Sequence, residues 1–488
     1  MEQHTVCLLN DSFPPTIDGV ANTVINYAKI IEENYGHAIV ATPSVPGAHD
    51  TGFSFPVLRY PSIDTRKLVG YVAGYPFSPE VAGRLSAAHV ELLHAHCPVS
   101  SCLLARSLRN VVNAPLVLTY HTKFDIDIAK AIRGRVLQTG AIRALVQNVS
   151  ACDEVWVVSR GAGENLRSLG YEGDYIIMEN GVDLPRGGAK QEAVFAATKD
   201  YDLPDGVPVF LFVGRLMWYK GLRMILDALR TLRESGTDFR MVFIGDGADG
   251  AQVRQYALEQ GLDDRCFFTG AIAERETLRA WYTRADLFLF PSTFDTNGLV
   301  VREAAACGTA TVMIRGSCAS EGVTDGENGF LIDENAASLA AELEKLCAAP
   351  EVMARVGSHA EQQLYISWEA AVRRAWERYE IVIDNYRSGR YKKHNKPFDA
   401  FLKSQGELME VLSEANRVRD EAMEKLRGER LERTTGLESR RRGRIGEREE
   451  KKMEAHRCIR ELKQEVQGVR EELKEACEVF WQNMDRYL

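Results

Sequence analysis

Two carboxylates, Asp295 and Glu303, lie eight residues apart where the sequence predicts that a strand gives way to a helix. The apolar run 287–290 ends in a Pro-Ser pair, which predicts a buried strand, a loop, and a helix that opens near Gly298. The first turn of a helix leaves N–H groups unpaired and carries partial positive charge, so a diphosphate fits there. Gly298 would let it approach closely, and the carboxylates would hold hydroxyls on either side. A diphosphate flanked by two sugars is a nucleotide sugar.

A second predicted strand-to-helix loop carries two cations, Arg215 and Lys220. The apolar run 207–214 predicts the strand, and a helix is expected over 222–235. An arginine can bind phosphate oxygens bidentately, and a lysine adds a point charge. Negative charge builds on a diphosphate as a glycosyl group leaves it, so this pair is expected to stabilise the transition state.

Other polar residues stand at predicted strand ends, where parallel α/β sheets bind their ligands. His121 ends one apolar strand, and Gly19 opens the helix that follows the first strand, where it would admit a diphosphate. The segment 94–97 holds two histidines and a cysteine, but no second cluster has matching ligand spacing, so no metal is expected. The acidic pair Asp125 and Asp127 is expected to favour the start of a helix.

Together these motifs resemble the signature of retaining glycosyltransferases of family 4. That signature has two acidic residues separated by seven, with a Gly-apolar helix start between them. It also has a loop that runs from Gly-Arg to Lys-Gly, which stands here at 214–221. Asp295 replaces the usual Glu, which keeps the charge on a shorter side chain. The resemblance covers residues 1–388 and implies a GT-B fold, in which two Rossmann-like domains face a cleft.

The resemblance also implies a role for each matched residue. Glu303 would hold the ribose, Asp295 would hold the donor sugar, and His121 would lie beside the donor sugar and the acceptor. The residues predicted to be catalytic are His121, Asp295, Arg215 and Lys220. Those predicted to bind the donor are Gly19, Arg215, Lys220, Ile272, Asn297, Gly298, Leu299, Val300 and Glu303. The family is thought to use same-face attack with the leaving phosphate as base, and a divalent metal is not required.

Predicted strands separated by helices occupy both halves of the chain, so both are expected to be doubly wound parallel sheets. We expect an acceptor domain over 1–183, a nucleotide-sugar domain over 184–368 and a crossover helix over 369–388. The remaining segment, 389–488, lies beyond the resemblance and is expected to be a charged helical tail.

The tail carries two stripes of apolar residues at heptad spacing, one starting at Phe401 and Leu408, the other at Ile459 and Val466. Between them lies a basic, glycine-containing segment that includes the arginines of 440–444. The stripes predict either a hairpin or a coil shared with another chain. The arginines are expected to be solvated or to touch anionic lipid headgroups.

Composition narrows the class of protein. The 488-residue chain has a net charge of −9, and we count roughly 24 Lys/Arg against 21 Asp/Glu in the tail, so the body is acidic. An acidic body argues against nucleic-acid binding. Ten scattered cysteines predict reduced thiols of a cytoplasmic chain, and neither a signal peptide nor a membrane-spanning run is predicted. The chain is expected to be cytoplasmic, with peripheral contact to the inner face of a membrane.

The leading hypothesis is therefore a hexosyltransferase that uses a nucleotide sugar, a UDP-sugar before GDP-mannose. The Tyr-His-Thr context of His121 resembles the branch of the family that acts on lipid or lipid-linked acceptors. One alternative is an NAD-linked oxidoreductase or epimerase, because 245–250 fits G-x-G-x-x-G. Another is a catalytically weak scaffold with a coiled-coil arm, which the Asp at position 295 would suit.

Overall fold

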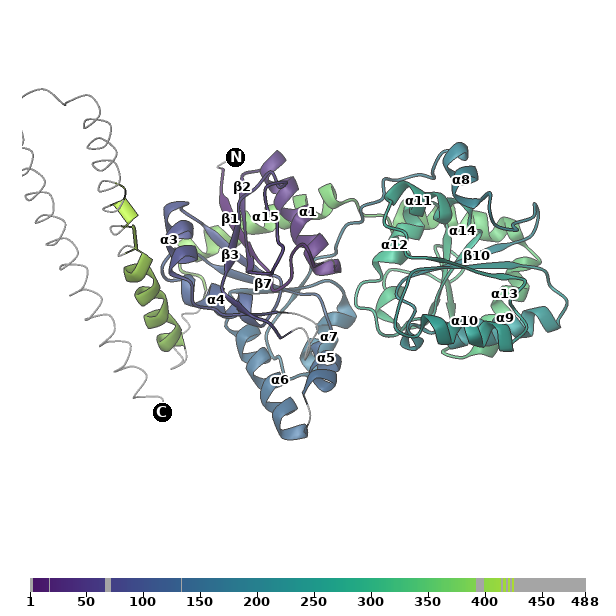
Figure 1. Cartoon of the computed structure of the whole chain (residues 1–488), viewed down its shortest axis with the longest axis horizontal. Coiled ribbons are helices and arrows are strands. Elements are labelled where there is room, and N and C mark those ends of the chain that lie inside the picture. Colours follow the sequence, from purple (N-terminus) through teal and green to yellow (C-terminus); the bar gives the residue numbers. More distant parts are fainter. Residues whose placement is uncertain are drawn as a thin grey trace, which may run out of the picture. The chain divides into compact units, whose positions relative to one another are not determined.

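The computed structural model describes residues 3–16, 18–65, 72–132, 134–391, 399–413, 416–417, 420–421 and 424. These residues form two compact units (Figure 1). One unit contains the described residues within 1–118, 143–155 and 379–424, and the other those within 119–142 and 156–378. None of the described helices is both long and apolar enough to cross a membrane.

The first parallel sheet has seven strands in the order β3-β2-β1-β6-β7-β8-β9. Its strands are β1 (Thr5–Leu9), β2 (His37–Pro43), β3 (Val57–Tyr60), β6 (Leu92–Ala95), β7 (Leu116–Tyr120), β8 (Glu154–Val157) and β9 (Ile176–Ile177). A separate antiparallel pair consists of β4 (Ser62–Ile63) and β5 (Ala73–Gly74). The inner strands β6 and β7 are buried at every position, which explains their continuous apolar sequence.

The second parallel sheet has six strands in the order β12-β11-β10-β13-β14-β15. Its strands are β10 (Val209–Val213), β11 (Arg240–Ile244), β12 (Cys266–Gly270), β13 (Leu287–Phe290), β14 (Ala310–Ile314) and β15 (Phe330–Ile332). The chain moves outward from β10 to β12 and then returns to β13 on the other side of β10. That reversal creates a crevice at the carboxyl ends of β10 and β13, where open α/β sheets bind ligands.

Helices alternate with the strands of both sheets, as the sequence predicts. Before β10 they are α1 (Gly19–Asn34), α3 (Pro79–Ala87), α4 (Ser100–Leu108), α5 (Phe124–Ala131), α6 (Arg135–Ser150), α7 (Arg160–Ser168) and α8 (Gln191–Thr198). After β10 they are α9 (Leu222–Glu234), α10 (Gly250–Glu259), α11 (Arg275–Arg284), α12 (Leu299–Ala306), α13 (Ala336–Cys347), α14 (Pro350–Gln363) and α15 (Trp368–Arg387). Two short 3-10 turns are η1 (Trp218–Lys220) and η2 (Cys318–Ser320). The predicted α/β fold with two doubly wound parallel sheets is confirmed.

The long helix α15 contributes its residues up to Arg378 to one unit and those from Tyr379 onward to the other. Its Tyr379 hydroxyl lies 2.5 Å from Nδ1 of the buried His94. The rings of His94 and His96 lie 4.0 Å apart, both packed edge-on against Tyr27. The two histidines of the segment 94–97 therefore pack against aromatic side chains in the first unit.

The described part of the predicted tail includes one helix that lies against the first unit. Residues 399–413 are helical and pack on the first unit, with Leu402, Leu408 and Met409 buried. Sδ of Met409 accepts a hydrogen bond from the Ser78 backbone at 3.0 Å. Of the first predicted stripe, Leu408 is buried, but the buried face also includes Leu402 and Met409, which the stripe omits. The predicted hairpin or coil shared with another chain stays a prediction, and the second stripe, from Ile459, lies outside the described residues.

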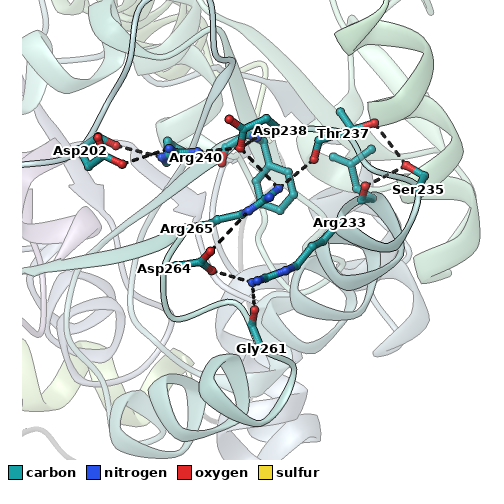
Figure 2. Close-up of polar contacts among 11 residues, drawn as sticks. Asp202, Arg233, Ser235, Thr237, Asp238, Arg240, Gly261, Asp264 and Arg265 are labelled. Carbon is teal, nitrogen blue, oxygen red and sulfur yellow. Dashed lines mark hydrogen bonds and ion pairs between the residues drawn. The ribbon is translucent and has the colours of Figure 1, made fainter.

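An ion-pair network lies at the amino ends of the strands of the second sheet (Figure 2). Arg240, the first residue of β11, pairs with Asp202 at 3.0 Å and with Asp238 at 2.8 Å. Arg265, just before β12, donates to the Thr237 carbonyl at 2.9 Å. Arg233, at the end of α9, pairs in the same way with Asp264 and with the Gly261 carbonyl. These arginines link neighbouring loops at the amino edge of the second sheet, which is the edge opposite the crevice.

Candidate active site

Two cations, Arg215 and Lys220, follow β10 at the carboxyl edge of the second sheet. We call them the phosphate-loop cations. Lys220 is buried, and its ammonium forms an ion pair with Asp295 from the loop after β13. The other oxygen of Asp295 accepts a hydrogen bond from the Ser292 hydroxyl at 2.6 Å. Two residues that the sequence placed on separate motifs are thus in direct contact. Without a ligand, each neutralises the other.

Close packing of two loops brings Lys220 and Asp295 together. Gly221 follows the lysine with φ of +79°, in the left-handed region that suits glycine. A Cβ atom on Gly221 would lie 2.2 Å from the carbonyl oxygen of Pro291 in the loop after β13. The Lys-Gly pair of the motif therefore has a physical reason, because only glycine permits this approach.

Arg215 differs from Lys220 in its surroundings. It is exposed, and its guanidinium makes no ion pair or hydrogen bond with any residue that the structure describes. Exposed arginines elsewhere in this unit, such as Arg275 and Arg315, pair with carboxylates. A cation at the carboxyl edge of the sheet without a protein partner is available to an anionic ligand.

Helix α12 begins at the crevice with an uncapped first turn. Its N-cap is Gly298, with φ of +56°, and no side chain that the structure describes caps the first N–H groups. A Cβ atom at Gly298 would lie 2.9 Å from Cβ of Ala319. The side-chain nitrogen of Asn297 is buried and has no hydrogen-bond partner among the described residues. Leu299 and Val300 occupy the first turn, so the predicted donor residues 297–300 present N–H groups together.

Glu303 lies one turn further along α12 and is buried. Its oxygens contact Nη1 of Arg275 at 3.4 Å and the Tyr282 hydroxyl at 3.0 Å. Burial raises the pKa of Glu303 to about 6, against the lowering effects of Arg275 and the Tyr282 hydrogen bond. At neutral pH the carboxylate is mostly ionised, so it can accept hydrogen bonds from hydroxyl groups.

Sequence reasoning missed the residues that hold Glu303. Arg275 also pairs with Asp183 at 2.6 Å, and Asp183 accepts a hydrogen bond from Nε1 of Trp368 at 2.7 Å. These partners come from distant points of the chain, and no short-range spacing connects them. The glutamate of the motif is therefore fixed by a set of contacts that only the folded chain brings together.

His121 also belongs to this unit, and it is buried. Its carbonyl accepts a hydrogen bond from Oγ1 of Thr296 at 2.6 Å, and Nζ of the neighbouring Lys123 donates to the Thr293 carbonyl at 3.2 Å. The predicted histidine and the Asp295 loop are thus linked. Burial lowers the pKa of His121 to about 3, so its imidazole is neutral at neutral pH.

The glycine-rich segment 245–250 has a structural explanation. A Cβ atom on Gly245 would lie 2.0 Å from the Gly214 carbonyl oxygen, and one on Gly247 would lie 2.4 Å from that of Leu216. These glycines let two loops of the protein touch. Asp249 accepts the Trp218 N–H at 2.9 Å, close to the phosphate-loop cations. A second aspartate, Asp246, accepts a hydrogen bond from the Ala271 N–H at 3.1 Å, next to Ile272, which is predicted to bind the donor.

Gly19 belongs to the other unit and begins α1. The carboxylate of Asp18 already accepts the N–H groups of Val20 and Ala21 at 2.9 and 2.7 Å. This helix start therefore has a capping carboxylate, unlike the start of α12. The predicted role of Gly19 in donor binding remains a prediction.

Comparison with known proteins places this geometry in a family. Residues 17–186 match the family model described as Glycosyltransferase Family 4, and residues 195–363 match Glycosyl transferases group 1. The chain belongs to these glycosyltransferases. The border between the two matches falls between β9 and β10, where one parallel sheet ends and the next begins.

Two relatives are similar along most of the chain. An alpha-monoglucosyldiacylglycerol synthase of Streptococcus pneumoniae is 24% identical over 78% of this chain and 86% of its own length. A GDP-mannose-dependent alpha-mannosyltransferase of Corynebacterium glutamicum is 26% identical over 76% of this chain and 86% of its own.

Solved structures share the fold. The Anabaena protein Alr3699/HepE, crystallised with UDP and glucose, superposes with a TM-score of 0.60 at 20% identity, over 77% of this chain and 99% of its own. A sucrose-phosphate synthase of Thermosynechococcus elongatus superposes with a TM-score of 0.63 at 21% identity, over 78% of this chain and 100% of its own. The GT-B fold is confirmed. The chain is a glycosyltransferase that takes a nucleotide sugar as donor, and the oxidoreductase alternative is not favoured.

Proposed function

We propose that the chain transfers a hexose from a nucleoside diphosphate sugar to a hydroxyl of a lipid or lipid-linked glycan, with retention of anomeric configuration. One observation carries the proposal. The neighbouring strands β10 and β13 deliver Arg215, Lys220 and the uncapped start of α12 to the same edge of the sheet. Two cations and a row of N–H groups are the chemistry that a leaving diphosphate needs.

The cations act on the leaving group. As the bond from the anomeric carbon to the diphosphate oxygen breaks, negative charge grows on the diphosphate. Arg215 makes no polar contact within the described part of the chain that it would have to give up, so its guanidinium can bind phosphate oxygens directly. Lys220 can exchange its contact with Asp295 for one with the phosphate. That exchange frees Asp295 to accept a hydrogen bond from a hydroxyl of the donor sugar.

The remaining residues position the donor and the acceptor. Glu303 accepts the ribose hydroxyls, held in place by Arg275 and Tyr282. Neutral His121 lies beside the Asp295 loop and hydrogen-bonds a sugar hydroxyl without adding charge. The acceptor oxygen attacks the anomeric carbon from the face that the diphosphate leaves, and its proton passes to a leaving phosphate oxygen. These groups supply the positive charge themselves, so the proposal calls on no divalent metal.

For the donor we propose a UDP-sugar first and GDP-mannose second. The structural relative crystallised with UDP and glucose supports the first choice, and the mannosyltransferase named for GDP-mannose supports the second. The relative named a monoglucosyldiacylglycerol synthase supports a glycolipid acceptor. The predicted peripheral contact with the membrane surface would bring the enzyme to such an acceptor.

The test is a transfer assay with each sugar nucleotide and diacylglycerol or monoglucosyldiacylglycerol in mixed micelles. The expected result is one glycolipid product whose anomeric proton couples as an α-linkage does when the donor is α-linked. A β-linked product would contradict retention. Oxidation or epimerisation of the sugar nucleotide without transfer would contradict the proposed reaction.

A further inference from the structure

Two of the most exposed apolar side chains in the described part of the protein are neighbours on the first turn of α6. Val136 is 86% exposed and Leu137 is 65% exposed. Leu145 and Val149, in the second half of the helix, are the apolar residues of α6 that are buried in the core. Packing against the described residues therefore does not explain why two large apolar side chains stand at the other end of the helix.

Contacts of the first turns of α6 are local. The Gln138 side chain donates to the Ile132 carbonyl at 2.8 Å, and Oγ1 of Thr139 donates to the Arg135 carbonyl at 2.8 Å. These bonds hold the first turn to its own helix and to the loop before it. The side chains of Arg135, Val136 and Leu137 are left exposed.

The same segment is basic in a chain that is acidic as a whole. Residues 128–152 contain Lys130, Arg133, Arg135 and Arg143 and no Asp or Glu, whereas the whole chain has a net charge of −9. On α6 itself, Arg143 lies seven residues after Val136, which places both on one face of the helix. An apolar pair with arginines beside it fits a surface that offers both phosphates and hydrocarbon.

We propose that the first three turns of α6, with Arg135, Val136, Leu137 and Arg143, dock onto an anionic phospholipid bilayer. Val136 and Leu137 enter the boundary between headgroups and acyl chains, and the arginines bind headgroup phosphates. A nucleic acid would satisfy the arginines but would leave the apolar pair in water, so a lipid surface is the better match. The proposal does not rest on the donor site.

The test is binding of the full chain, without donor, to vesicles of phosphatidylglycerol and phosphatidylcholine, with pure phosphatidylcholine vesicles for comparison. We expect the wild type to sediment with the anionic vesicles and to be released by salt. The variant R135Q/R143Q should bind roughly 25-fold more weakly, since each cation near an anionic surface contributes about fivefold. The variant V136S/L137S should lose roughly tenfold or more at the same salt concentration.

Control variants remove the same charge, or an exposed apolar side chain, elsewhere on the protein. The side chains of Arg186 and Arg230 are 53% and 48% exposed, and R186Q/R230Q should bind as the wild type does. Phe195 on α8 is 70% exposed, and F195S should also bind as the wild type does. Circular dichroism of each variant checks that its fold is intact.

Three results would overturn the proposal. Wild-type vesicle binding by both α6 variants would show that another surface docks. Loss with R135Q/R143Q but not with V136S/L137S would show a polyanion site without insertion, which RNA would then compete for. Conversion of a dimer to a monomer by V136S/L137S would show that the pair is a contact between copies of this chain. Transfer to a detergent-dispersed acceptor is measured separately, so failure here leaves the proposed reaction standing.

Discussion

The two edges of the second sheet use charged residues in opposite ways. At the amino edge, Arg240 and Arg265 are bound by carboxylates and carbonyl oxygens from neighbouring loops (Figure 2). At the carboxyl edge, Arg215 is exposed with no partner among the described residues, and Glu303 is buried with its pKa raised to about 6. Satisfied charges stabilise loops, whereas a free cation and a desolvated carboxylate add little stability and suit a ligand.

Lys220→Ala should have the largest effect on catalysis. Lys220 is the buried one of the two cations, and removing its ammonium leaves Asp295 without its ion-pair partner. Loss of a preorganised charge at a leaving group typically lowers kcat by about a hundredfold to a thousandfold. Steady-state transfer kinetics measure the loss, and wild-type turnover would contradict the assignment of Lys220.

Arg215→Ala and Arg240→Ala form a pair that separates the two edges. Arg215→Ala should lower kcat/KM by about tenfold or more and leave Tm unchanged, because the side chain supports no described contact. Arg240→Ala should leave kcat/KM unchanged and lower Tm by about 2–4 °C, since it breaks contacts with Asp202 and Asp238. The comparison fails if both variants lose activity, or both lose stability, to the same extent.

The pH dependence of donor binding should report Glu303. Its pKa is about 6, so roughly a tenth of the carboxyl groups are ionised at pH 5. Protonation removes the acceptor for the ribose hydroxyls, so the donor KM should rise about tenfold between pH 7.5 and pH 5. Glu303→Gln should have a high KM that no longer varies over this range. A Gln variant that keeps the wild-type pH profile would assign the titration to another group.

Gly298→Ala should have the smallest of these effects. The substitution places a side chain at φ of +56° and 2.9 Å from Cβ of Ala319. Strain of about 1–2 kcal/mol is expected, which should lower Tm by a few degrees and raise the KM for the donor. Gly236→Ala provides the control, since it also has positive φ but nothing within 4 Å of its Cβ position. Equal donor KM values in the two variants would contradict the role of the first turn of α12 in donor binding.

The sequence predicted the strands and loops that carry the site better than it predicted how the site is held together. Apolar runs such as 209–213 are local features, so β10 and the Arg215 loop were found directly. The contact between Lys220 and Asp295 spans 75 residues and depends on β10 and β13 being neighbours. Arg275 and Tyr282 could not be found for the same reason.

Two sequence patterns, the glycines of 245–250 and the heptad spacing from Phe401, show that local spacing does not reveal tertiary packing. The G-x-G-x-x-G segment suggested a dinucleotide, but Gly245 and Gly247 are required because other backbone lies against them. The heptad spacing from Phe401 suggested a hairpin or a coil shared with another chain, and it did not reveal that Leu402 and Met409 are buried on the first unit. A spacing pattern does not say what a loop or a helix face packs against.

The most direct test of the account is nucleotide binding by the wild type, R215A/K220A and R240A, measured by thermal shift. The panel contains UDP, UDP-glucose, GDP, GDP-mannose and NAD. Ligand at about a hundred times its Kd stabilises a protein by roughly 2.7 kcal/mol, which gives a clear rise in Tm. We predict a rise with one nucleoside diphosphate and its sugar in the wild type and in R240A, and none in R215A/K220A. A rise with NAD alone, or an undiminished rise in R215A/K220A, would contradict the assignment of the carboxyl edge as the donor site.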